Sequence, residues 1–119
     1  MNNLKLFREL SKTSAKKIAS LLNVSVYTYY GLEKERMVLD NVLQRMLEKI
    51  YDIFPEELFC EKDNISVKSI ANIKKMSLLS ESAKYDLMIY NLIGERKKIT
   101  YKDISKIKKN LRDSINKKI

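Results

Sequence analysis

Histidine is absent from the 119-residue sequence, and cysteine, proline and glycine are scarce. Without imidazole, the chain has no Ser-His-Asp or Cys-His relay and no H-E-x-x-H zinc site. The single cysteine, Cys60, permits neither an internal disulfide nor a zinc cluster. Two glycines and one proline supply little turn material for a many-stranded sheet, and no glycine-rich phosphate loop is present. We therefore expect no enzymatic activity, no cofactor and no metal.

Long apolar runs are also missing. No segment approaches the roughly 18 residues of a membrane span, and the first residues, Met1-Asn2-Asn3, do not resemble a signal peptide. Hydrophobic residues make up 45% of the chain and charged residues 33%, which is typical of a globular protein. The sequence predicts a cytoplasmic protein that has no contact with a membrane.

Positive charge is in excess and unevenly distributed. The formal net charge is +9, of which residues 1–60 contribute +1 and residues 61–119 contribute +8. A basic chain attracts an acidic partner, and nucleic acid is the usual one.

Apolar residues recur at helical spacing along the whole chain, and no stretch alternates as a strand does. Residues suited to helix N-caps precede these stretches at Ser14, Ser25, Asp40, Ser66 and Ser80. The sequence predicts an all-α protein with a five-helix unit over residues 1–60, whose short fifth helix begins at Pro55. A three-helix region over residues 65–119 follows, and its last helix runs to Ile119.

Residues 14–33 have the pattern of a helix-turn-helix motif. A small residue, Ala19, stands where the two short helices approach, Asn23 tolerates the left-handed turn conformation, and Ser25 caps the second helix. A plain helical hairpin within a bundle has the same local pattern. The stretch resembles the lambda-repressor-like, Cro-type family of bacterial and phage regulators. The resemblance extends over about residues 3–60, through the closing Pro-Glu-Glu-Leu-Phe.

The resemblance implies a set of functional positions. Arg8 and Glu33 match a structural pair between the first and third helices of that family. The expected DNA-contacting residues are Ser14, Ala15, Lys16, Ser25, Val26, Tyr27, Thr28, Tyr30, Gly31, Lys34 and Arg36, with Asn41 as a further backbone contact. Tyr29 falls on the buried position of the third helix, whereas Tyr27 and Tyr30 are expected to be exposed.

The expected recognition helix, which follows Ser25, lacks Gln, Arg and Asn, the side chains that bond bidentately to adenine and guanine edges. Ala15 also stands where the family commonly has a polar residue. Val26 and Thr28 can pack on thymine methyls, and the Tyr27 hydroxyl can bond a base or a phosphate. We therefore expect modest direct readout, A/T-leaning sites, and a large share of the affinity from phosphates and DNA shape.

These features predict a sequence-specific transcriptional regulator that binds double-stranded DNA, an autorepressor from a phage or other mobile element. Residues 81–93 are apolar on nearly every face, so we expect them to form the core of a homodimer interface within residues 65–119. The expected interface residues are Tyr85, Leu87, Met88, Ile89, Tyr90 and Ile93.

A protein-binding inhibitor is the alternative. Some anti-CRISPR proteins and antitoxins join a lambda-repressor-like domain to an added effector region. In this reading the basic C-terminal half imitates or displaces nucleic acid on an acidic or nucleic-acid-binding protein partner.

Overall fold

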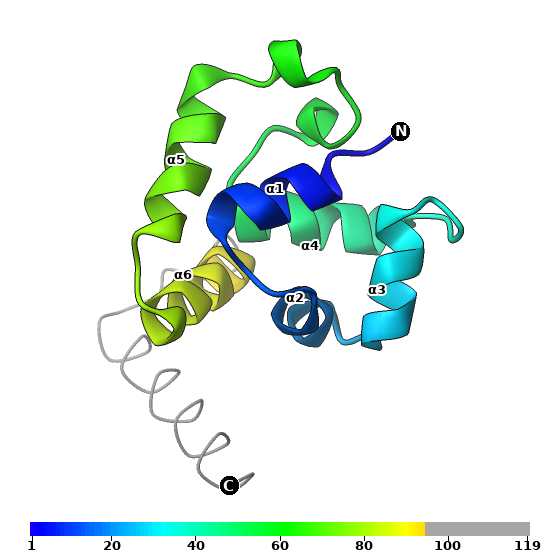
Figure 1. Cartoon of the computed structure of the whole chain (residues 1–119), viewed down its shortest axis with the longest axis horizontal. Coiled ribbons are helices and arrows are strands. Elements are labelled where there is room, and N and C mark those ends of the chain that lie inside the picture. Colours follow the sequence, from blue (N-terminus) through cyan, green and yellow to red (C-terminus); the bar gives the residue numbers. More distant parts are fainter. Residues whose placement is uncertain (95–119) are drawn as a thin grey trace, which may run out of the picture.

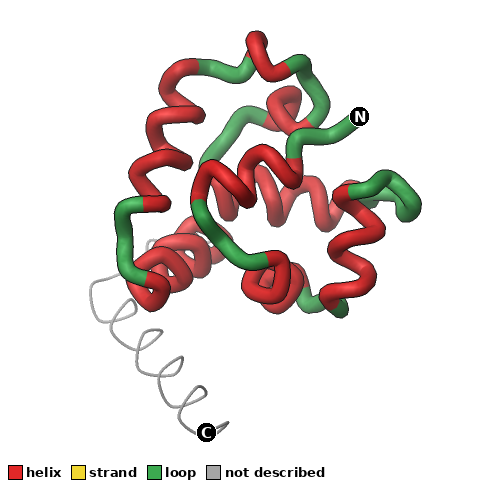
Figure 2. Tube along the Cα trace, viewed as in Figure 1, coloured by secondary structure: helices red, strands yellow, loops and turns green. Residues whose placement is uncertain are grey.

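The computed structural model describes residues 1–94, and these residues are helical with no strand among them. The α-helices are α1 (Leu4–Ser11), α2 (Ala15–Leu22), α3 (Val26–Glu33), α4 (Asn41–Tyr51), α5 (Val67–Ser77) and α6 (Glu81–Gly94) (Figure 1). Two 3-10 helices, η1 (Pro55–Leu58) and η2 (Lys62–Asn64), separate α4 from α5 (Figure 2). The predicted all-α class is confirmed for this part of the chain. None of its helices has the length and apolar character needed to cross a membrane.

The N-cap residues expected from the sequence begin the helices in the structure. Each cap oxygen accepts a hydrogen bond from the backbone N–H three residues later. These bonds are Ser14 with Lys17 (3.2 Å), Ser25 with Thr28 (3.0 Å), Asp40 with Leu43 (2.8 Å), Ser66 with Ser69 (3.1 Å) and Ser80 with Ala83 (3.2 Å). Because such caps satisfy N–H groups that have no partner inside the helix, they fix the starts of these helices locally.

The expected order of five helices followed by three is not reproduced in the described part of the chain. Four α-helices precede residue 60, and the segment from Pro55 forms the four-residue 3-10 helix η1 instead of a fifth α-helix. The third helix has eight residues rather than about ten, because the N–H groups of Arg36 and Met37 turn back to the Gly31 carbonyl (2.9 and 3.3 Å). The helix expected to end at Ile119 lies outside the described residues.

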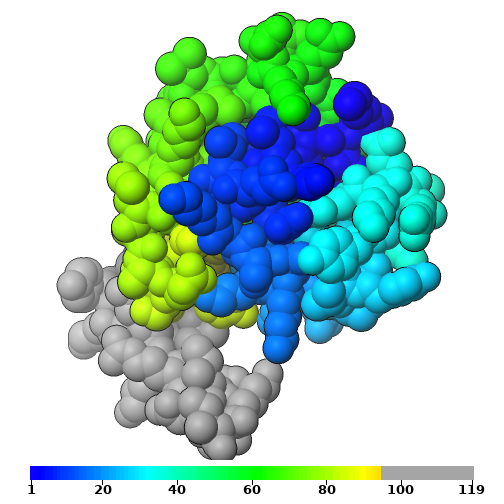
Figure 3. Space-filling view, viewed as in Figure 1, coloured from blue at the N-terminus to red at the C-terminus, as the bar shows by residue number. Residues whose placement is uncertain are grey.

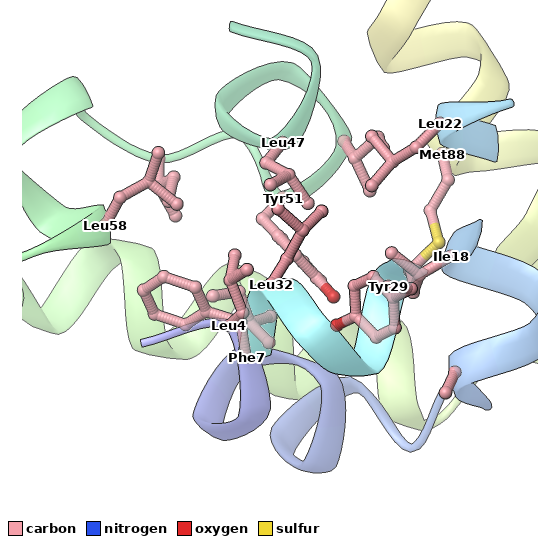
Figure 4. Packing of buried hydrophobic residues seen from close by; sticks show 14 of the residues in the cluster. Leu4, Phe7, Ile18, Leu22, Tyr29, Leu32, Leu47, Tyr51, Leu58 and Met88 are labelled. Carbon is pink, nitrogen blue, oxygen red and sulfur yellow. The ribbon is translucent and has the colours of Figure 1, made fainter. Parts of the chain in front are cut away.

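A single cluster of buried apolar side chains holds the described helices together (Figure 4). Members shown there are Leu4, Phe7, Ile18, Leu22, Tyr29, Leu32, Leu47, Tyr51, Leu58 and Met88. The cluster continues into α5 through Ile73 and Met76. The core therefore includes residues from both sides of the boundary near residue 60 that the sequence suggested.

The position of α6 corrects one prediction. Met88 was expected to face a second copy of the chain, but its side chain is fully buried in the chain's own core, near Ile18 (Figure 4). The reason is that α6 packs along α4, while α5 packs against α1 (Figure 1). A second chain is therefore not needed to bury this part of α6.

Polar contacts hold the first turn of α6 against the connection between α1 and α2. Lys84 is buried, and its ammonium donates hydrogen bonds to the Lys12 carbonyl (2.8 Å) and to the Glu81 carboxylate (3.2 Å). Glu81 also accepts a hydrogen bond from Lys17 on α2 at 2.5 Å. The hydrogen bonds from Lys17 and Lys84 lower the pKa of the Glu81 carboxyl. Glu81 therefore bridges a lysine of α2 and a lysine of α6.

Glu57 is a buried carboxylate that joins η1 to α5. It accepts hydrogen bonds from the N–H of Phe54 (2.9 Å), the N–H of Ser66 (2.7 Å) and the hydroxyl of Ser69 (2.6 Å). Burial opposes ionisation of the Glu57 carboxyl, but these hydrogen bonds outweigh burial and lower its pKa. Glu57 thus fixes the start of α5 relative to the first half of the chain.

Glu57→Gln should lower the free energy of unfolding at neutral pH by about 1–3 kcal/mol, because it replaces a carboxylate oxygen in a buried hydrogen-bond network. The pKa of Glu57 is lower in the folded chain than in the unfolded chain. Its stabilising effect is therefore complete above the ordinary carboxyl pKa and is lost as the pH falls through the lowered value. Thermal unfolding from about pH 7 to about pH 3 should show wild type and variant converging. Glu56→Gln, at an exposed residue of η1, is the control. If the difference in melting temperature between wild type and Glu57→Gln does not change with pH, the ionised Glu57 carboxylate does not stabilise the fold.

Ala19→Leu should destabilise the protein by about 1–3 kcal/mol, because Ala19 is 1% exposed where α2 packs on α3 and the larger side chain overpacks the crossing. Ala71→Leu makes the same change at an exposed position of α5 and should have little effect. Urea unfolding of both variants measures the difference. Equal midpoints for the two variants would show that the α2–α3 crossing is not tight.

Candidate DNA-binding site

The segment predicted to be a helix-turn-helix motif consists of α2, a three-residue turn and α3. Asn23 begins the turn in the left-handed conformation at φ 59°, as its sequence position suggested. The N–H of Val24 then donates to the Ala19 carbonyl at 3.0 Å. Since Ala19 has only a methyl side chain, α2 and α3 approach closely enough to bury Leu22 and Leu32. This packing fixes the orientation of α3 relative to α2.

Arg8 and Glu33, the structural pair implied by the resemblance, meet in the structure. The Arg8 guanidinium donates to both oxygens of the Glu33 carboxylate, from Nε at 2.6 Å and from Nη2 at 3.3 Å. The Arg8 side chain is 17% exposed and that of Glu33 is 5% exposed. The hydrogen bond to Glu33 raises the pKa of Arg8, so the guanidinium stays charged. The pair joins the C-terminal ends of α1 and α3.

Two tyrosines lie in the core beneath this pair. Tyr29 of α3 and Tyr51 of α4 are both fully buried, and Figure 4 shows their hydroxyl groups pointing toward one another. Burial raises the pKa of both phenols, so both remain neutral at physiological pH. Tyr29 is therefore a core residue, in the position expected from the sequence.

The opposite side of α3 faces solvent. Tyr27 is 77% exposed, Tyr30 is 42% exposed and Val26 is 36% exposed. Lys34 and Arg36, which follow the helix, are exposed as well. In the space-filling view, α3 and the residues that follow it form one side of the molecule, away from α5 (Figure 3). An exposed aromatic pair beside two cations is typical of a binding surface.

The expected hydroxyl contacts are used within the motif. The Ser14 and Ser25 side chains cap α2 and α3, and the Ser25 hydroxyl also donates to the Thr28 hydroxyl at 2.9 Å. These groups retain spare acceptor capacity, but their first role is to begin the helices. Lys16 is exposed at the start of α2, and Asn41 is exposed at the start of α4.

Two of the expected DNA-contacting residues do not present a side chain to solvent. Ala15 is 4% exposed because its methyl group belongs to the core face of α2, so only its backbone stands at the start of that helix. Gly31 is buried because Met37 covers it: a Cβ atom there would lie 3.1 Å from Met37 Cγ and Sδ. Sequence reasoning missed Met37, because only the reversal of the chain after α3 places it over Gly31.

This reversal creates a hollow of about 300 Å³ on the exposed side of α3. Its walls are Tyr27, Tyr30, Gly31, Lys34, Arg36 and Met37. Five of these six were expected DNA-contacting residues, and the structure brings them to one place. The helix spacing of Tyr27, Gly31 and Lys34 explains their alignment, since residues four and seven apart share a face.

The residues expected at a dimer interface lie on another element, α6. Tyr85, Leu87, Ile89 and Ile93 are half-buried, Met88 is fully buried, and Tyr90 is 40% exposed. Tyr85 also approaches α2, with its hydroxyl 3.4 Å from that of Ser20.

Comparison of the chain with models of known protein families, with curated proteins and with solved structures gave no match.

Arg8→Met should destabilise the protein by about 3 kcal/mol, because it leaves the poorly exposed Glu33 carboxylate without its partner. Adding Glu33→Gln to this variant removes the unpaired charge and should restore part of the lost stability. Lys17→Met, which breaks the more exposed pair with Glu81, should cost less than about 1 kcal/mol. Chemical denaturation of the wild type and the three variants measures their order of stability. A double variant less stable than Arg8→Met would contradict the prediction.

Proposed function

We propose that this protein is a transcriptional regulator that binds double-stranded DNA through α3 and the loop that follows it. The observation that carries the proposal is the side of α3 that bears Tyr27 and Tyr30 beside Lys34 and Arg36. A helix presented in this way on a helix-turn-helix scaffold fits the major groove of B-DNA.

The chemistry of this side suits backbone contacts and apolar base contacts. Lys34 and Arg36 can bond phosphate oxygens beside an inserted helix, and such contacts set the position of a protein on the duplex. The tyrosines offer one hydroxyl each and a large apolar ring. Since α3 carries no Gln, Asn or Arg, specificity should come mainly from apolar contacts and from DNA shape.

The distribution of charge in the sequence supports a polyanionic partner. Residues 1–94 carry 14 basic and 12 acidic side chains, whereas residues 95–119 carry 10 basic and 3 acidic ones. A basic segment joined to a DNA-reading unit adds affinity through counterion release without adding sequence information.

Binding of the purified full chain to the DNA upstream of its own gene, compared with a scrambled duplex at two salt concentrations, tests the proposal. A regulator should retain the upstream duplex preferentially at the higher salt concentration. Equal binding to both duplexes with a steep salt dependence would reduce the interaction to counterion release by a basic protein.

Tyr27→Ala should weaken binding to the preferred duplex by about tenfold, equivalent to about 1.4 kcal/mol, with no change in the melting temperature, because Tyr27 is mostly exposed. Phe59→Ala removes an aromatic side chain from an exposed position just after η1 and should leave DNA affinity unchanged. Fluorescence anisotropy with a labelled duplex measures both. If Tyr27→Ala binds the preferred duplex as tightly as the wild type does, α3 is not the recognition helix.

We propose a homodimer as the DNA-bound form, because two copies double the contacts on a palindromic site. The burial of Met88 removes one reason for a dimer, so α6 would contribute through Tyr90 and its half-buried neighbours. Light scattering of the full chain should give twice the chain mass of 14.0 kDa. A mass of one chain, free and on DNA, would exclude the dimer.

The competing function is a protein-binding inhibitor of the anti-CRISPR or antitoxin type. The observation that favours it is the absence of strong base-reading side chains from α3, together with the exposed tyrosines. In that case the upstream and scrambled duplexes would bind equally, and Tyr27→Ala would leave DNA affinity unchanged.

A further inference from the structure

The hollow beside α3 differs from a flat reading surface in both shape and chemistry. Aromatic rings and a thioether form much of its wall, and the backbone of Gly31 contributes where a side chain would otherwise project. Two cations, Lys34 and Arg36, complete the lining. The site therefore combines apolar walls with two positively charged side chains.

B-DNA presents one apolar group in its major groove, the C5 methyl of thymine. It projects from the base edge, and phosphates lie on both sides of the groove. A hollow lined by apolar groups and two cations matches this combination. Cytosine presents an amino donor and no methyl, so it offers no apolar group to the rings and the thioether of the hollow.

We infer that the hollow lined by Tyr27, Tyr30, Gly31 and Met37 receives thymine methyl groups, with Lys34 and Arg36 on the neighbouring phosphates. This inference rests on the proposed binding of α3 in the major groove. It assigns thymine recognition to the hollow and makes Gly31 and Met37 specificity-determining residues. Their role follows from the reversal of the chain after α3, which places Met37 over Gly31.

Gly31→Ala offers a small and specific change to this site. The added methyl would meet Met37 Cγ and Sδ at 3.1 Å and Cε at 3.3 Å, so the Met37 side chain must shift. Met37 is 38% exposed and flexible, so it can move without unfolding the protein. The wall of the hollow then changes, while Lys34 and Arg36 remain.

Gly94→Ala is the matched control. A Cβ atom at Gly94 would lie 3.9 Å from the Tyr90 ring, which is an ordinary contact, and Gly94 ends α6 rather than α3. Both variants should give the helical circular dichroism of the wild type.

Four duplexes of equal length separate the methyl group from the rest of the base pair. All four are DNA with alternating sequences: A·T, A·U with deoxyuridine in place of thymidine, G·C, and G paired with 5-methylcytosine. The A·U duplex lacks only the thymine methyl, and 5-methylcytosine adds the same methyl to G·C. Anisotropy titrations of the full chain at one fixed salt concentration give the affinities.

The wild type should bind the A·T duplex about fourfold more tightly than the A·U duplex for each methyl it buries, a factor that corresponds to about 0.8 kcal/mol. It should also prefer the 5-methylcytosine duplex to G·C. Gly31→Ala should lose both preferences and keep the salt-dependent binding, whereas Gly94→Ala should retain both preferences.

Equal wild-type affinity for the A·T and A·U duplexes would overturn the inference, as would a preference that survives in Gly31→Ala. Tighter binding to the single strands than to the duplexes would also overturn it, in favour of stacking of unpaired bases on the tyrosines. Failure to bind any of the four duplexes would overturn it as well, whereas failure to prefer the upstream duplex over the scrambled one would contradict the proposed function itself. The two claims therefore fail separately.

Discussion

The ion pair between Arg8 and Glu33 is the interaction on which the presentation of α3 depends. It joins the C-terminal ends of α1 and α3 at a place where both side chains are largely withdrawn from water. Tyr29 is buried on the same side of α3, so this side is fixed by apolar packing and by charge together. Because one side of the helix is held in this way, Tyr27 and Tyr30 face outward.

The second half of the described chain supports this unit through two polar contacts and a shared core. Glu57 accepts hydrogen bonds from the start of α5, and Lys84 donates to the carbonyl of Lys12, the residue that follows α1. Buried charged groups require such partners, since each would otherwise lose its hydration without compensation. The contacts therefore define where α5 and α6 lie, while apolar side chains such as Met88 contribute the burial.

The exposed side of α3 combines few hydrogen-bonding groups with a hollow and two cations. This chemistry favours a ligand that offers both apolar and anionic groups. The major groove of A/T-rich DNA meets both requirements, because thymine methyls line its floor and phosphates form its edges. The same side of α3 would also suit an acidic protein surface. The two proposed functions therefore use the same surface of this protein and differ in the partner, DNA or another protein.

The sequence by itself determined the helices of the first 94 residues and their starts. Capping and turn conformation are local properties, and Ser14, Asn23 and Ser66 act within a few residues of their own positions. The apolar spacing also identified Tyr29 as buried, because only one side of a short helix can face the core. The η1 segment was less predictable, since four residues after Pro55 can form either a 3-10 turn or the first turn of an α-helix.

Only the tertiary structure decided which residues contact one another. The burial of Lys84 depends on its contact with Lys12, 72 residues earlier in the chain, and the cover of Met37 over Gly31 depends on the reversal of the chain after α3. Neither contact leaves a periodic signal in the sequence. The apolar character of residues 81–93 was visible in the sequence, but whether α4 or a second chain would bury Met88 was not. Hydrophobic burial is non-directional, so a sequence pattern specifies that a side chain leaves water, and packing specifies against which neighbour it does so.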